Sequence, residues 1–163
     1  MVLDIFVEGC DDSMSCQYSG FGKFRCEILR GWNEELGKLY EEKYDCLWNR
    51  DIEFGFLALA SMLTKTNEIK SIDDKMKKIL EEYDKPYNEG MKIFFYHSDC
   101  DGEISPAECE LILKSFNHVD PEKFDKSNDE TNEWLRESYN TWIVMLKYAI
   151  ENNKPIIHRV IKV

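Results

Sequence analysis

Apolar side chains recur at steps of three and four residues over much of the chain, a spacing typical of amphipathic helices. One such run covers residues 21–44 and predicts a long helix. Residues 52–63 are nearly all apolar and too long for most strands, so they predict a buried helix. A third run predicts a helix that Pro86 ends. Its inner face comprises Ile72, Met76, Ile79, Leu80 and Tyr83.

Two further helices are predicted in the C-terminal half. The first has Ser105 as its N-cap, Pro106 at the first helical position and Glu108 at the third, which is the sequence of a capping box. A charged connection over residues 120–129 leads to the second, a long helix rich in apolar residues. They include Trp134, Leu135, Trp142, Ile143, Met145, Leu146, Tyr148, Ala149 and Ile150.

Three short segments favour strands. Residues 3–7 and 155–163 lie near the two ends of the chain, and a polar, acidic loop over residues 9–19 follows the first of them. Residues 91–97 form a continuous run of β-favouring side chains, which predicts a central strand covered on both faces. The expected fold class is α/β (α+β), with about three short strands packed by about five helices. We expect a single globular domain over residues 1–163.

The charge of the chain narrows its choice of partners. Lys and Arg number 21 against 32 Asp and Glu, so the formal net charge is −11. Such a chain repels phosphate backbones, and its longest basic run is the pair Lys77 and Lys78, so direct nucleic-acid binding is not expected. The charge suits a basic protein partner, although it also serves to keep the protein soluble.

We expect the six cysteines to be free thiols rather than disulfides. A secreted, disulfide-bonded domain would need a signal peptide, whereas Asp4 and Glu8 interrupt the apolar residues at the start. The longest weakly charged stretch, residues 54–64, is too short to cross a membrane. We therefore expect a protein of the reducing cytoplasm with no membrane partner.

The chemically most specific segment is residues 97–108. On the twelve-position loop that binds calcium, Gly102 falls at position six, where the chain turns sharply. The ligand positions are then His97 at one, Asp99 at three, Asp101 at five, the Glu103 carbonyl at seven, Ser105 at nine and Glu108 at twelve. The segment resembles an EF-hand calcium loop, which implies a divalent cation, calcium first and manganese or magnesium second.

Two features depart from the EF-hand pattern. His97 at position one offers a nitrogen ligand, which calcium tolerates poorly. The element expected before the loop is a strand over residues 91–97, not a helix. A paired EF-hand that opens on binding its ion is therefore not implied.

The same residues resemble the first motif of the DHH phosphoesterases, in which a strand delivers His-x-Asp-x-Asp-Gly to a metal at the start of a helix. His97, Asp99 and Asp101 match as candidate ligands, and a nitrogen with two carboxylates suits manganese. The further aspartates and the Asp-His-His motif of that family do not follow, because the only later histidines are His118 and His158. A metal-dependent phosphoesterase acting on a small phosphate or nucleotide is the alternative function.

A purely structural interpretation also fits this segment. Asp-Gly is a common turn pair, and the side chains of Asp99 and Asp101 can accept hydrogen bonds from local amides. Glu108 can simply complete the capping box. A capped turn and an ion site are compatible, because a cation would relieve the crowding of carboxylates at this helix N-terminus.

Four short pieces spread over most of the chain form a recognisable set: Met-x-Leu-Asp at the start and residues 18–25, 97–106 and 146–153. Together they resemble a family of small proteins from low-GC bacteria and their phages. The resemblance implies no particular activity.

Two classes of function follow. The first is a non-enzymatic acidic accessory protein of bacterial or phage type, whose ion-stabilised loop serves as a brace or contact surface and which binds, and could inhibit, a basic protein partner. The second is the phosphoesterase, which predicts further carboxylates or histidines around Asp99 and Asp101 and an adjoining pocket. The sequence favours the first.

Overall fold

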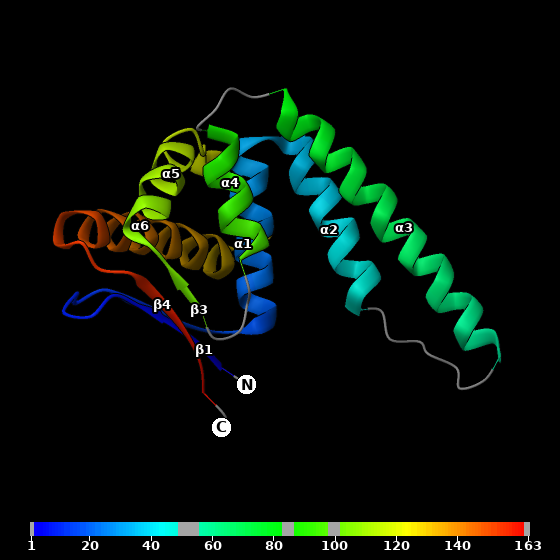
Figure 1. Cartoon of the computed structure of the whole chain (residues 1–163), viewed down its shortest axis with the longest axis horizontal. Coiled ribbons are helices and arrows are strands. Elements are labelled where there is room, and N and C mark those ends of the chain that lie inside the picture. The colour runs from blue at the N-terminus through cyan, green and yellow to red at the C-terminus, as the bar shows by residue number, and fades with distance from the viewer. Residues whose placement is uncertain (1, 49–55, 83–86, 98–101, 162–163) are drawn as a thin grey trace.

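The computed structural model describes residues 2–48, 56–82, 87–97 and 102–161. Four antiparallel strands form one sheet in the order β2-β1-β4-β3, and helices pack on one face of it, so the expected α+β class is confirmed (Figure 1). The strands are β1 (Val2–Phe6), β2 (Ser13–Gln17), β3 (Gly102–Ile104) and β4 (Ile156–Ile161). Strands from the two ends of the chain, β1 and β4, therefore pair at the centre of the sheet.

Six α-helices and one short 3₁₀ turn complete the regular secondary structure of the described residues. They are α1 (Tyr18–Trp32), α2 (Glu34–Trp48), α3 (Phe56–Glu81), α4 (Tyr87–Tyr96), α5 (Pro106–Phe116), the 3₁₀ turn η1 (Pro121–Lys123) and α6 (Asp129–Asn152). Helices α1, α4, α5 and α6 gather over the sheet, while α2 and α3 lie side by side and extend away from it (Figure 1). None of the helices in the described ranges is both long and apolar enough to span a membrane.

The core forms where the sheet meets the helices, around Trp142 of α6. The Trp142 ring is fully buried, and its centroid lies 5.1–6.3 Å from those of four phenylalanines. These are Phe21, Phe24, Phe94 and Phe116. The sheet contributes every second residue, as in β1, where Leu3 and Ile5 are buried and their neighbours are not. The two-residue period of a strand thus turns one apolar face toward the helices.

The strand expected over residues 91–97 is wrong, because these residues belong mainly to helix α4. Met91, Phe94 and Phe95 are buried, and their three- and four-residue spacing places them on one helical face. Gly90 lets α4 approach α5 closely, since a Cβ there would overlap the backbone carbonyl of Leu111. Packing of one helix on another outweighs the local preference of these side chains for a strand.

Other predicted elements differ in their bounds. The helix expected over residues 21–44 is two helices, because Asn33 adopts an extended backbone and its Oδ1 accepts a hydrogen bond from Leu36 N at 3.0 Å. The helices expected over residues 52–63 and 72–83 form one helix, α3, where described. Residues 52–55 and 83–86 lie outside the described ranges. The loop expected over residues 9–19 contains β2, whereas the terminal strands and the long helix α6 are confirmed.

Candidate functional site

The segment 97–108 joins two helices. Helix α4 ends just before it, β3 lies within it, and its last three residues, 106–108, are the first residues of α5. The expectation that a strand precedes the loop is therefore wrong, because a helix does. A helix, a loop and a helix in this order are the arrangement of the EF-hand, so the element before the loop no longer departs from the EF-hand pattern. Asp99 and Asp101, the candidate ligands at positions three and five, lie outside the described residues.

His97 turns its side chain back onto the loop. Its backbone N donates to Ile93 O at 3.0 Å and so continues the hydrogen bonding of α4. Its ring Nε2 lies 3.2 Å from the Glu103 carbonyl oxygen, and because a carbonyl only accepts, the ring N–H is the donor. A Cβ on Gly102 would lie 3.0 Å from His97 Cε1, which is tighter than an ordinary contact. Gly102, at position six, therefore leaves room for the His97 ring, whose hydrogen bond links position one to position seven.

Strand β3 anchors the second half of the loop to the sheet. Ile104 is fully buried and pairs with Ile156, while Glu103 pairs with Ile157 and leaves its carboxylate exposed. Burial of Ile104 holds the backbone of positions seven and eight in place. The sequence alone shows a hydrophobic residue here but not the partner strand, which comes from the far end of the chain.

Ser105 and Glu108 form the expected capping box at the start of α5. Glu108 Oε2 accepts from Ser105 N at 2.8 Å and from Ser105 Oγ at 2.7 Å, while Glu108 N lies 3.4 Å from Ser105 Oγ. Ser105 and Glu108, the candidate ligands at positions nine and twelve, are thus hydrogen-bonded to each other. A carboxylate has about four acceptor positions, so Glu108 retains capacity for a cation.

Two residues that the sequence did not single out as site residues lie directly behind the loop. His158 of β4 is 2 % exposed, and its ring centroid is 4.6 Å from that of His97. Arg25 of α1 is also 2 % exposed; its Nη2 donates to the His97 carbonyl at 2.7 Å, and its guanidinium lies 4.5 Å from the Phe21 ring centroid. No local spacing could have revealed them, because α1 and β4 are distant from the loop in sequence.

An open hollow of about 440 Å³ adjoins the loop at the β3–β4 edge. It is lined by Gly102, Glu103, Ile157, His158 and Arg159. Within the described ranges, no group of three or more histidine, cysteine, aspartate or glutamate residues is placed to hold a metal ion.

The structure bears differently on the two resemblances. The phosphoesterase motif places a strand before its histidine, whereas helix α4 precedes His97. The calcium-loop pattern places a helix there, as observed. No protein-family model, curated protein or solved structure matches the chain.

Proposed function

We propose that the chain is a non-enzymatic binding protein whose segment 97–108 holds a divalent cation and whose acidic surface docks a basic protein partner. The observation that carries the first part is a contact within the loop, between its first position and its seventh. The His97 ring, at position one, and the Glu103 carbonyl, at position seven, lie 3.2 Å apart between helices α4 and α5. Groups at two of the candidate ligand positions therefore already lie side by side, joined by a hydrogen bond that a bound ion would replace or share.

The donor set of the loop supports this proposal. Carboxylates at positions three, five and twelve and a carbonyl at seven supply the hard oxygens that calcium prefers. For the ion to bind the Glu103 carbonyl oxygen, the His97 ring N–H must turn away from that oxygen or share it with the ion. Calcium is the first candidate, and manganese is the second because it accepts the imidazole nitrogen as a ligand more readily.

The net charge of −11 supports the second part of the proposal. A surface with this excess of carboxylates speeds the approach of a basic protein and raises the rate of association at low salt. An ion in the loop would brace the junction of α4, β3 and α5, and so fix the shape presented to that partner. The ion then acts as a structural element and takes part in no reaction.

Calorimetric titration of chelator-treated protein with calcium tests the ion site. Glu108→Gln is the informative variant, because glutamine still completes a capping box but lacks the charge that the ion requires. We expect it to weaken calcium binding at least about tenfold with little change in the stability of the ion-free protein. Asp101→Asn should weaken binding in the same way.

The matched control is Glu110→Gln. Glu110 is exposed on the same helix, and its substitution removes one negative charge without touching the capping box. Equal calcium affinity in Glu108→Gln, Glu110→Gln and the unchanged protein would refute the site. Manganese-dependent hydrolysis of a nitrophenyl phosphate ester that disappears in Asp101→Asn would instead favour the phosphoesterase alternative.

A further inference from the structure

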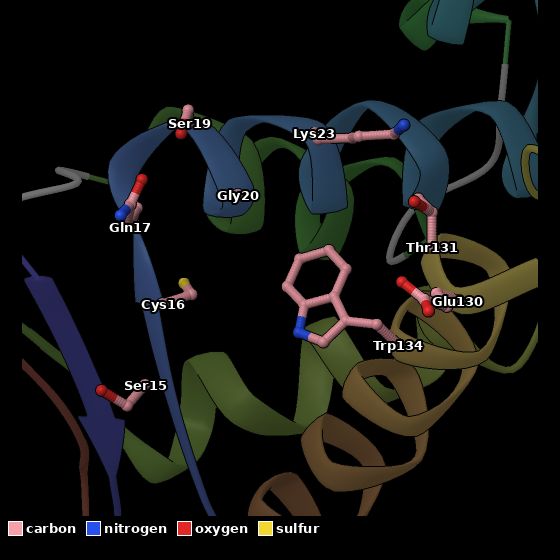
Figure 2. Close-up of a pocket in the computed structure, with 9 residues that line it drawn as sticks. All are labelled: Ser15, Cys16, Gln17, Ser19, Gly20, Lys23, Glu130, Thr131 and Trp134. Carbon is pink, nitrogen blue, oxygen red and sulfur yellow. The ribbon is translucent and has the colours of Figure 1, made fainter. Parts of the chain in front are cut away.

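A second hollow, of about 460 Å³, lies on the opposite edge of the sheet. It opens between β2, the first turns of α1 and the start of α6, and the Trp134 indole forms one of its walls (Figure 2). Figure 2 shows this indole reaching from α6 toward Cys16 beneath α1, with the Glu130 side chain beside it. A volume of this size suits one large side chain or a small molecule.

Strand β2 forms one side of the hollow. Ser15, Cys16 and Gln17 are consecutive and all line it. Because neighbouring side chains of a strand point to opposite faces, three consecutive residues line one hollow when it opens along the strand edge. Strand β2 is the end strand of the described sheet and pairs there with β1 alone. Its outer backbone groups are thus placed to pair with an added strand.

The charges around the hollow favour a cation. Lys23 lies in its wall, but Lys23 Nζ is 3.3 Å from Asp125 Oδ2, which balances that charge. Glu130 is exposed and takes part in no ion pair with the residues that the structure describes. Asp129 and Glu133 are exposed as well, so the first turns of α6, where the hollow lies, carry an excess of negative charge. The indole face next to Glu130 adds the negative side of an aromatic ring.

The thiol in the hollow is suited to contact rather than to reaction. Burial, and after it the charge of Asp4, raises the pKa of the Cys16 thiol to about 11. At neutral pH the thiol is therefore protonated, and a thiol in that state is a poor nucleophile. The hollow combines an aromatic wall, a carboxylate and a strand edge, which are features of a peptide-binding surface.

We propose that an extended basic segment of a partner protein adds to the outer edge of β2 and places an arginine or lysine side chain in this hollow, between Trp134 and Glu130. This inference rests on the proposed function, because it says where the basic partner binds. Backbone hydrogen bonds to β2 supply affinity that does not depend on sequence, and the hollow selects the charged side chain. A two-residue repeat in the segment turns every second side chain toward the protein.

Fluorescence anisotropy at low salt tests the proposal with a labelled, blocked hexapeptide of alternating valine and arginine. A peptide with citrulline in place of arginine is the uncharged control. We expect Glu130→Gln and Trp134→Ala each to weaken binding of the arginine peptide about three- to tenfold. Glu151→Gln is the matched control, since it removes one exposed carboxylate from the other end of α6 and should leave the affinity unchanged.

Gly20→Leu offers a variant that fills the hollow without removing a charge. A Cβ on Gly20 would lie 3.7 Å from both Cys16 Cβ and Trp134 Cη2, an ordinary contact distance, so the added side chain starts inside the hollow. Far-ultraviolet circular dichroism should show an unchanged fold, while binding of the arginine peptide falls at least about tenfold. Amide hydrogen exchange on the unchanged protein should show protection of β2 when the peptide binds.

Three results would overturn the inference in different ways. Equal binding of the arginine peptide to the unchanged protein and to every variant of the hollow would place the basic partner elsewhere and leave the proposed function standing. Absence of binding to the unchanged protein at low salt would contradict both the inference and the basic partner. Binding of blocked arginine alone as tightly as the peptide, without protection of β2, would assign the hollow to a small cation instead of a strand.

Discussion

The close contact of α4 with α5 makes a quantitative prediction for Gly90→Ala. A Cβ at residue 90 would overlap the backbone C and O of Leu111, and backbone atoms cannot move aside as the end of a flexible side chain can. Overpacking of this kind costs about 1–3 kcal/mol, against a gain of about 1 kcal/mol from the higher helix propensity of alanine. With rigid neighbours we expect a net loss of about 2 kcal/mol, or a fall in Tm of about 4–8 °C.

Gly20→Ala is the matched control for this prediction. Gly20 is also helical, but its added Cβ would meet only ordinary contacts at 3.7 Å. The same substitution should therefore stabilise the protein there, by up to about 1 kcal/mol.

Urea unfolding followed by circular dichroism measures both variants, with equal m-values required for the comparison. If residues 91–97 formed the strand that their sequence favours, alanine at residue 90 would meet no such overlap. Gly90→Ala as stable as Gly20→Ala would refute the packing of α4 on α5.

Two further predictions concern the core. Burial raises the pKa of the Cys26 and Cys109 thiols from an ordinary value of 9.0 to about 12, so the folded state retains these protons more strongly than the unfolded chain. The urea concentration at the midpoint of unfolding should stay constant below pH 9 and decrease as the pH rises toward 12. The decrease should be smaller in Cys109→Ala. A midpoint that stays constant up to pH 11 would contradict the prediction. Trp142→Ala removes the ring at the centre of the core and should cost about 3–5 kcal/mol in urea unfolding, whereas a loss below about 1 kcal/mol would show that the ring is not packed as described.

The sequence predicts correctly those helices, strands and caps that depend on residues close together in the chain. The capping box follows from Ser105, Pro106 and Glu108 alone, and it forms as expected. The terminal strands and α6 follow from their hydrophobic periods. In β2, Met14 and Cys16 alternate with polar residues, a two-residue period that indicates a strand within a segment interpreted as a loop.

The features that the sequence did not predict depend on distant partners. Helix α4 forms where Gly90 meets the backbone of Leu111, a contact between two separate elements. The position of His158 beside His97 depends on the pairing of β4 with β3, and the hollow at Trp134 depends on the approach of α6 to β2. The spacing within one segment carries no information about such contacts. Sequence therefore identified the candidate loop but neither its surroundings nor the second hollow.

Thermal melts of chelator-treated protein with calcium, manganese, magnesium or zinc test the central claim most directly. An ion that binds only the folded state at a hundred times its Kd adds about 2.7 kcal/mol, which corresponds to about 5–11 °C in Tm for a domain of this size. We predict a shift of that order with sub-millimolar calcium and smaller shifts with manganese and magnesium. In Asp101→Asn the shift with the same calcium concentration should be at most about half as large, because binding at least tenfold weaker lowers the added stability to about 1.4 kcal/mol or less. If none of the four ions raises the Tm, residues 97–108 form a capped turn and not an ion site, which would contradict the account.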